Sequence, residues 1–431
     1  MCSLRRKVYF CSVKRVLTYL IYIYVPLAAV LTGVSCSDDE TSEPTPEKVI
    51  PGFPGQRLAR TAIIYMAGEN SLASFVGEDS VEIARGLSAI PADSRVVIYI
   101  DDTKSSRICA GSRTEKLQVV KTYDSNISST VEEGMTRVLT DIIELYPAEH
   151  YGITFWSHGS GWTFPTSSAV KSIRPTAFGF DNGQRNQSNS GPQMNPVTMR
   201  QVLSCFPRFD YMLFDACYMQ CVELAYELRE RTDYVIASPA EIPGPGAPYT
   251  EMLAAMCQVP ADVKGMVNTY VDYYEAQKAG SYYPGAELSL IQTSGLKNLA
   301  DATAPIVQRL LGGRTQATTS DIQRYCFDTT ANAEYYDMKN WFYHALSQGE
   351  LTTEEYDAWL DVYQQAVPLV RLSPEWFSAQ PTKRMRSVAD REHCGGVSIF
   401  IPSETYAAKG WVERYHALAW YEAVHMNLTG W

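Results

Sequence analysis

Two short segments of the chain carry the residue types that cysteine-based chemistry needs. The segment 157–162 holds His158 among small residues, and Asp215-Ala216-Cys217 holds a cysteine two residues after an acid. A histidine beside a cysteine takes the thiol proton, and the resulting thiolate is a strong nucleophile. Gly159 leaves its backbone N–H open to an approaching oxygen, as an oxyanion donor must be. The two segments therefore indicate attack on a carbonyl group.

Each of these residues also has a purely structural interpretation. A single histidine at the end of a strand is more often part of the fold than of a catalytic site. A cysteine with apolar neighbours is usually a small buried hydrophobe. Cys217 and Cys221 lie four residues apart and fit a core equally well. Residue types and spacing alone leave both interpretations open.

The elements around these segments alternate between strand and helix. Apolar runs that end in small or acidic residues predict buried strands, and apolar positions with a period near 3.6 predict helices. Such an order predicts an α/β fold, with a mainly parallel sheet and helices on both faces. The predicted strands are 61–66, 95–100, 117–122, 151–156, 211–214 and 234–237, and the predicted helices are 71–87, 130–145 and 218–229.

The candidate residues directly follow strands 151–156 and 211–214. Ligands of parallel sheets bind beyond the carboxyl ends of the strands, so His158 and Cys217 are expected at one shared edge. A helix that begins at Tyr218 would also place the thiol at its amino end, where the helix dipole favours a thiolate.

The rest of the chain adds no competing chemical motif. The sequence contains no Gly-x-Ser-x-Gly elbow, no His-Glu-x-x-His, no P-loop and no complete dinucleotide-binding loop. Residues 157–195 are predicted to be irregular, and the chain after residue 295 mostly helical with a late strand at 396–401. The remaining histidines are interpreted as surface or core residues: His150, His344, His393, His416 and His425.

With their flanking residues, the two motifs resemble those of the clostripain family of cysteine peptidases. The resemblance covers roughly residues 60–430 and implies a caspase-like α/β/α sandwich with a mainly parallel sheet, followed by a mostly helical C-terminal part. The matching segments are 156–162 and 214–219, with weaker matches at 64–72, 180–181, 237–249 and 396–402.

The resemblance also implies roles for individual residues. Cys217 is then the nucleophile and His158 the general base and later the general acid, and the N–H groups of Gly159 and Cys217 form the oxyanion hole. Family members tend to cleave after Arg or Lys, and acids lie in the pocket for that side chain (the S1 pocket). Asp215 and Glu241 are the candidate S1 acids in this sequence.

Two regulatory features of some relatives have candidates here. The chemistry itself requires no cofactor, and calcium is an optional addition, although no EF-hand loop is present. Candidate sites for self-cleavage between the histidine and the cysteine are Lys171, Arg174 and Arg185. The loop acids that calcium would use are Asp101, Asp102 and Asp181.

The amino terminus is typical of an export signal. Five basic residues are followed by the uncharged, apolar stretch Val16–Leu31 and then by small residues. This stretch is shorter than the ~20 residues of a membrane-spanning helix, and a retained anchor is the alternative. Segment 33–36 resembles a lipobox, so Cys36 is the predicted lipidation site after removal of residues 1–35. The acidic stretch 37–40 resembles the tether of surface lipoproteins in some Gram-negative bacteria.

Composition limits the partners and suggests the domain organisation. The chain has 431 residues, of which 45% are hydrophobic and 20% charged, which is typical of a folded protein. Its net charge of −11 argues against nucleic acid or anionic lipid as a partner. The predicted organisation is a signal peptide (1–35), a disordered tether (36–56), a peptidase core (57–295) and a C-terminal helical part (296–431).

Together these features predict an exported, lipid-anchored cysteine endopeptidase that cleaves polypeptides after Arg or Lys. Its expected location is the cell envelope, at the outer membrane or cell surface of a Gram-negative bacterium. One alternative is a catalytically inactive caspase-like lipoprotein that binds peptides. The other is a surface lipoprotein that binds glycans, because the chain contains 28 Tyr and 8 Trp.

Overall fold

The structure is a computed structural model, in which one unit comprises residues 50–431. The signal segment, Cys36, Lys171 and Arg174 lie outside the described residues. No helix of the described part is both long and apolar enough to cross a bilayer. The described residues are 52–124, 126–162, 178–277, 285–314, 317, 319–325, 335–377, 385–388 and 390–431.

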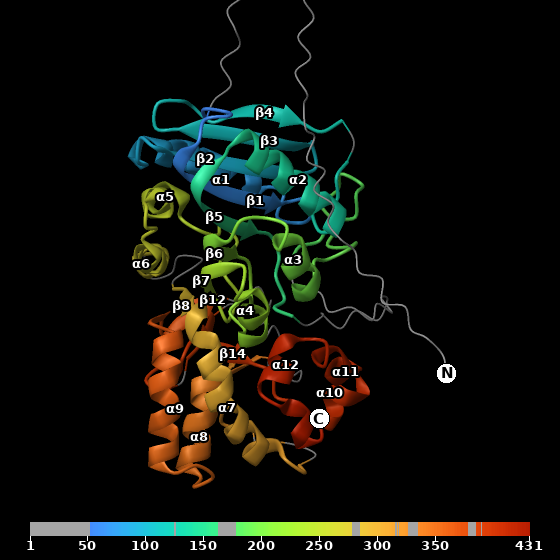
Figure 1. Ribbon diagram of the computed structural model, residues 1–431, viewed down its shortest axis with the longest axis vertical. Helices are drawn as coiled ribbons and strands as arrows, with labels where there is room; N and C mark the ends of the chain where they lie inside the picture. Colours follow the sequence, from blue (N-terminus) through green and yellow to red (C-terminus); the bar gives the residue numbers. More distant parts are fainter. Residues whose placement is uncertain are drawn as a thin grey trace, which may run out of the picture. The chain divides into compact units, whose positions relative to one another are not determined.

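The unit is built on a nine-stranded sheet with the order β11-β8-β7-β6-β5-β1-β2-β3-β4 (Figure 1). The five central strands, from β7 to β2, run parallel, and two antiparallel strands extend each edge. The α/β class and the mainly parallel sheet are therefore confirmed. The strands are β1 (Leu58–Ala67), β2 (Ser94–Asp101), β3 (Ser106–Ser112), β4 (Gln118–Thr122), β5 (Ala148–Trp156), β6 (Phe209–Asp215), β7 (Thr232–Ala237), β8 (Glu287–Gln292) and β11 (Leu369–Leu372).

Helices cover both faces of this sheet. Alternate residues of the central strands enter two separate apolar clusters, because successive strand side chains point to opposite faces. One face packs against α1 (Phe75–Gly86), α5 (Tyr249–Cys257) and α6 (Val263–Glu275). The other face packs against α2 (Glu132–Leu145), α3 (Pro196–Leu203), α4 (Val222–Leu228) and the C-terminal helices.

The C-terminal part is mostly helical, as predicted. Figure 1 shows its three longer helices side by side, beyond the sheet edge that β8 and β11 form. These are α7 (Leu296–Leu311), α8 (Met338–Ser347) and α9 (Thr353–Ala366). The smaller elements are α10 (Glu404–Ala408), α11 (Trp411–Tyr415), α12 (Ala419–Ala423), η1 (Leu87–Ala89), η2 (Thr293–Gly295), η3 (Met426–Thr429), β9 (Arg324–Tyr325), β10 (Tyr335–Asp337), β12 (Glu375–Phe377), β13 (Met385–Ser387) and β14 (Ser398–Ile399).

The ordered body begins earlier than the predicted boundary at residue 57. The buried side chain of Arg95 donates hydrogen bonds to the carbonyl oxygens of Gly52, Phe53 and Gln56. The Gly55 N–H donates to the Leu145 carbonyl at 2.7 Å. These residues are rich in glycine and proline, so composition alone assigned them to the tether.

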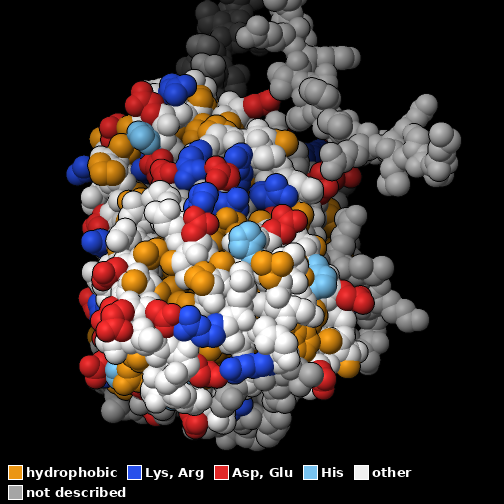
Figure 2. Space-filling view, turned by 60° about the horizontal axis from the view of Figure 1, so that its bottom comes forward, with side chains coloured by type: hydrophobic (Ala, Val, Ile, Leu, Met, Phe, Trp, Pro, Cys, Tyr) orange, Lys and Arg blue, Asp and Glu red, His pale blue; other side chains and the backbone are white. Residues whose placement is uncertain are grey.

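Charged side chains of both signs share the surface. On the face in Figure 2, Lys and Arg side chains gather near the middle, with Asp and Glu side chains among them.

Candidate active site

The strand register brings the two predicted segments together. β5 and β6 are parallel neighbours, and Trp156 pairs with Asp215 at their carboxyl ends. His158 and Cys217 therefore each follow a paired position by two residues. The Ser157 N–H also donates to the Asp215 carbonyl at 3.4 Å, which continues the contact beyond the strands. The expectation of a shared edge agrees with this geometry.

Gly159 makes the closest approach between the two segments. A Cβ atom added to Gly159 would lie 2.4 Å from the Cys217 carbonyl oxygen and 3.0 Å from both the Ala216 Cβ and the Met219 Sδ. Only a residue without a side chain fits there without a shift. The histidine and cysteine loops thus pack backbone against backbone.

The predicted start of the helix after Cys217 is wrong. α4 begins at Val222, and Tyr218 has a left-handed backbone with φ of 62°. This conformation is strained for a bulky residue and turns the chain directly after the cysteine. The segment cannot begin a helix because its next N–H groups bond across the sheet edge, Tyr218 to Ala240 and Gln220 to Ser238. The expected help from a helix dipole is therefore absent.

The environment of Cys217 favours a neutral thiol. Burial, and after it the nearby Glu241 carboxylate, raise the pKa of the Cys217 thiol to about 12. The Ile242 N–H donates to the sulfur at 3.4 Å, which acts in the opposite direction. Negative charge near a thiol opposes its ionisation, so the resting residue is a thiol and not the thiolate that the sequence suggested.

His158 is neutral as well. Burial lowers the pKa of the imidazole to about 4, and a side-chain hydrogen bond with Asn189 acts in the opposite direction. The ring packs edge-on against Phe180, and its Nε2 atom lies 2.9 Å from the Ser71 hydroxyl. Among the described residues, no hydrogen bond joins His158 to Cys217. The resting pair is thus a neutral imidazole near a neutral thiol, and a proton must move when the substrate is attacked.

Two backbone N–H groups at this edge are the candidate donors to an oxyanion. Neither the Gly159 N–H nor the Cys217 N–H donates a backbone hydrogen bond within the described part of the chain, whereas the Tyr218 N–H donates to Ala240. A developing negative charge on a substrate oxygen needs such preorganised donors. The geometry is compatible with the expected oxyanion hole.

Asp215 lies buried beneath the segment 243–248. Its Oδ2 atom accepts hydrogen bonds from the Ala247 N–H at 3.0 Å and the Tyr249 hydroxyl at 2.9 Å. A Cβ added to Gly246 (φ +70°) would lie 2.6 Å from the same oxygen, so a glycine leaves the carboxylate its space. Burial raises the pKa of Asp215 to about 6. The carboxylate is therefore ionised at neutral pH and protonated in mild acid.

Glu241 is also buried, and its effect on the pKa of the Cys217 thiol places its charge near the sulfur. Asp215 raises that pKa as well. The two predicted S1 acids therefore both act on the thiol, although they come from different segments. A third acid, Asp79 of α1, lies near Asp215, and burial raises its pKa to about 9. The position of Asp79 near Asp215 follows only from the packing of α1 against α5.

The candidate calcium ligands are only partly brought together. Asp101 and Asp181 lie with Glu69 so that carboxylate oxygens fall within 4.8 Å of one another. Asp102 is not in this cluster and instead forms an ion pair with Arg107 at 2.8 Å. The sequence did not indicate Glu69 as a calcium ligand, because Glu69 follows β1, whereas Asp101 lies at the end of β2.

Protein groups bond to several oxygens of this cluster, whereas the buried Asp101 Oδ2 atom has no hydrogen-bond partner among the described residues. The Arg185 guanidinium lies 2.7 Å from Asp101 and 3.5 Å from Glu69. Asp181 accepts hydrogen bonds from the Ser129 N–H and hydroxyl and from the Gly183 N–H. Calcium requires 6–8 oxygen ligands, so these residues do not fit the ion while Arg185 stays in place.

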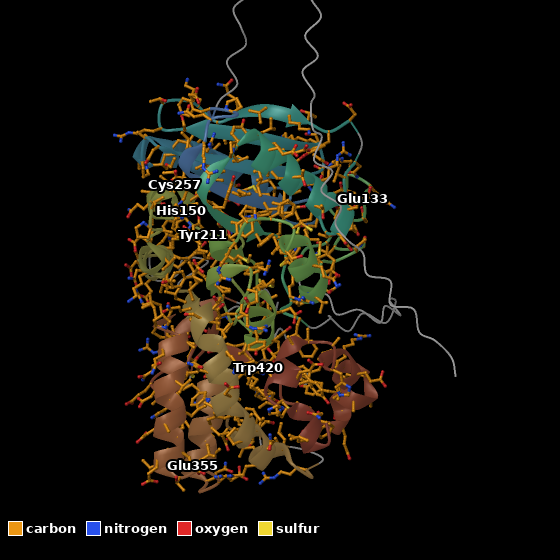
Figure 3. The ribbon with its side chains drawn as sticks, in the orientation of Figure 1. Glu133, His150, Tyr211, Cys257, Glu355 and Trp420 are labelled. Carbon is orange, nitrogen blue, oxygen red and sulfur yellow. The ribbon has the colours of Figure 1, made fainter. Side chains whose placement is uncertain are left out.

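The other histidines lie away from this edge. His150 stands near the amino end of β5, where its Nδ1 atom lies 3.1 Å from the Asp210 carboxylate. Figure 3 shows it in the same part of the fold as Cys257 and Tyr211. His150 thus lies near the amino end of β5, whereas His158 follows the carboxyl end, at the edge that also carries the segment after β6.

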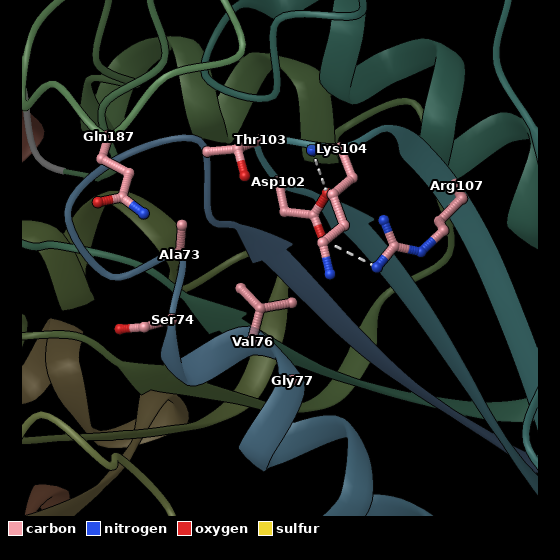
Figure 4. A pocket seen from close by; sticks show the side chains of 9 residues that line it. All are labelled: Ala73, Ser74, Val76, Gly77, Asp102, Thr103, Lys104, Arg107 and Gln187. Carbon is pink, nitrogen blue, oxygen red and sulfur yellow. Dashed lines mark hydrogen bonds and ion pairs between the residues drawn. The ribbon is translucent and has the colours of Figure 1, made fainter.

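A surface pocket of about 300 Å³ lies beside the segment that follows β1 (Figure 4). None of the predicted site residues except Asp102 lines it, and Asp102 is bound there to Arg107. The pocket is lined by Ala73, Ser74, Val76, Gly77, Asp102, Thr103, Lys104, Arg107 and Gln187.

A layered α/β/α fold with histidine and cysteine at neighbouring strand ends is the architecture of caspase-like cysteine peptidases. Comparison with known proteins agrees. The model of the clostripain family (Peptidase C11) matches residues 64–429. The chain therefore belongs to the clostripain family of cysteine proteases. No protein from a search of curated sequences matches it.

Solved structures of related proteases share the fold. A secreted C11 cysteine protease from Bacteroides thetaiotaomicron, in complex with an irreversible peptide inhibitor, is 30% identical with a TM-score of 0.70, covering 86% of this chain and 99% of that one. An inactive zymogen C11 protease from Parabacteroides distasonis is 27% identical with a TM-score of 0.69, at 86% and 99% coverage. A B. fragilis cysteine protease is 28% identical with a TM-score of 0.52, at 59% and 99% coverage.

Proposed function

We propose that the protein hydrolyses peptide bonds with Cys217 as nucleophile and His158 as general base and then acid. The close approach of Gly159 to the Cys217 carbonyl is the observation that carries this proposal, because it holds both loops at one edge. His158 removes the thiol proton as sulfur bonds to the substrate carbonyl carbon. The C–N bond then breaks, and the imidazolium gives its proton to the leaving amine. Water, deprotonated by His158, hydrolyses the thioester.

We further propose that the S1 pocket accepts Arg or Lys. Asp215 and Glu241 support this, because both are buried and both influence the Cys217 thiol. A basic substrate side chain forms charge-assisted bonds with such carboxylates. It also offsets the negative charge that opposes thiol ionisation, so occupancy of S1 favours formation of the nucleophile.

Activation by self-cleavage is part of the same proposal. The related zymogen from P. distasonis supports an inactive precursor. Arg185 is a poor cleavage site because its guanidinium is bound to Asp101 and to the Ser106 hydroxyl and cannot enter S1 at the same time. Lys171 and Arg174 are the remaining candidates.

We propose export and lipidation at Cys36 on the sequence signal alone, with polypeptides as substrates and a lipid anchor as the link to the membrane. The secreted B. thetaiotaomicron relative supports export. Because the Arg185 guanidinium lies within the acidic cluster around Asp101, we propose that activity does not depend on calcium.

The test uses a chloromethyl ketone with a basic residue and a fluorogenic peptide panel that varies the residue before the cut. Labelling at Cys217 that is lost in Cys217→Ala, with a ~10²–10⁴-fold loss of rate in His158→Ala, supports the dyad. A peptide-binding module would bind the peptides without labelling or turnover. Equal cleavage after acidic and basic residues would overturn the S1 assignment.

A further inference from the structure

A hydroxyl group to which the sequence motifs assigned no role contacts the proposed base. The Ser71 Oγ atom lies 2.9 Å from the Nε2 atom of His158. Ser71 follows β1, and β1 is the parallel neighbour of β5, which delivers His158. The strand order changes direction between these two strands, since β2 lies on one side and β6 and β7 on the other. Such a switch point forms the crevice in which ligands of α/β sheets bind.

The turn that carries Ser71 is fixed by its neighbours. The Asn70 side-chain amide donates to the carbonyl oxygens of Ala67 at 2.9 Å and Phe180 at 3.2 Å, and its oxygen accepts from the Leu72 N–H at 3.0 Å. The Ser71 N–H donates to the Asn189 side chain at 3.0 Å. These bonds fix the backbone that carries the Ser71 hydroxyl, as a preorganised site requires, and the same Asn189 side chain also bonds to the imidazole.

We propose that Ser71 is a positioning residue for His158, a role that rests on the proposed Cys–His chemistry. In this role the imidazole donates its Nε2–H to the Ser71 oxygen, which is one of the two directions that the contact allows. With that direction, the Nδ1 atom carries no hydrogen and can take the thiol proton. The same bond persists when the ring becomes an imidazolium, and it strengthens because the donor is then charged.

The Ser71 contact would stabilise the protonated form of His158, which burial makes costly. Burial lowers the pKa of His158 to about 4, so forming the imidazolium is costly, and among the described residues no carboxylate bonds to the ring. An oriented hydroxyl acceptor supplies part of the missing stabilisation. Ser71 thereby acts on the proton-transfer step and not on substrate binding.

Three variants test the proposal. Ser71→Ala removes the acceptor and should lower kcat about 10-fold with KM unchanged, as expected for loss of a hydrogen bond to a charged group. Ser71→Thr restores the hydroxyl and should recover most of kcat. Ser74→Ala is the matched control, because Ser74 lies in the same exposed segment and its hydroxyl makes no capping bond to α1. It should retain the kcat of the parent protein.

A measurement on the resting protein makes the test independent of activity. In ¹⁵N-histidine-labelled protein at neutral pH, the imidazole shifts of His158 should report the Nε2–H tautomer. Ser71→Ala should show a mixture of tautomers, and Ser71→Thr the parent spectrum. An unchanged spectrum and kcat in Ser71→Ala, with inactive Cys217→Ala and His158→Ala, would overturn the role of Ser71 alone. An active Cys217→Ala would instead overturn the proposed function.

Discussion

The close packing of the two catalytic loops gives a quantitative prediction for Gly159→Ala. The added Cβ would lie 2.4 Å from the Cys217 carbonyl oxygen, whereas ordinary contacts begin at 3.4 Å. The loops must therefore separate by about 1 Å. A misplacement of that size costs ~10²-fold in rate, equivalent to about 2.7 kcal/mol of transition-state stabilisation. We expect kcat/KM to fall by about that factor, mainly through kcat.

The assay compares kcat/KM on a fluorogenic Arg peptide with thermal unfolding of the same preparations. Overpacking at one site costs about 1–3 kcal/mol of stability, so the variant should unfold at lower temperature but still be folded at 25 °C. Gly77→Ala is the matched control, because a Cβ at this exposed position of α1 meets nothing within 4 Å. It should change kcat/KM by less than about twofold.

A fully active Gly159→Ala variant would contradict this prediction. If kcat/KM stays within about threefold of the parent and the unfolding temperature is unchanged, the histidine and cysteine loops do not pack together as described. The main support for the dyad would then be lost. A large loss in Gly77→Ala would show that any extra methyl group in this region impairs the enzyme, and the argument from Gly159 would fail with it.

Three other outcomes follow from the charges in the site. Because burial raises the pKa of Asp215 to about 6, this carboxylate loses its charge below that pH. The KM for Arg and Lys peptides should therefore rise below pH 6 in the parent protein and stay constant across this range in Asp215→Asn. A parent KM that does not change with pH would contradict the S1 role of Asp215. Addition or chelation of calcium should leave the activity unchanged while Arg185 fills the acidic cluster, and a severalfold loss on chelation would contradict this. If the protein cleaves itself, Lys171→Ala with Arg174→Ala should prevent the cut seen by mass spectrometry, whereas a cut after Arg185 would show that its ion pairs open.

Local patterns identified the strands that matter for the site. The apolar runs before His158 and Cys217 predicted β5 and β6 within a few residues, because buried parallel strands are short, apolar and end in small or polar residues. Strand β3 was missed, since Arg107 and the small residues after it break the apolar run. The helix start at Tyr218 was wrong because tertiary hydrogen bonds from Tyr218 and Gln220 override a helical apolar pattern.

What the sequence determined about this protein is the class of its chemistry: strand ends that deliver His158 and Cys217, and motifs that resemble one peptidase family. The tertiary structure determined the protonation states and the contacts of those residues. The neutral thiol and the neutral imidazole both arise from burial, and the Ser71 contact arises from the pairing of β1 with β5. Desolvation and hydrogen bonding between distant segments depend on which surfaces pack together. A residue pattern shows which side chains are present, whereas their protonation and orientation depend on that packing.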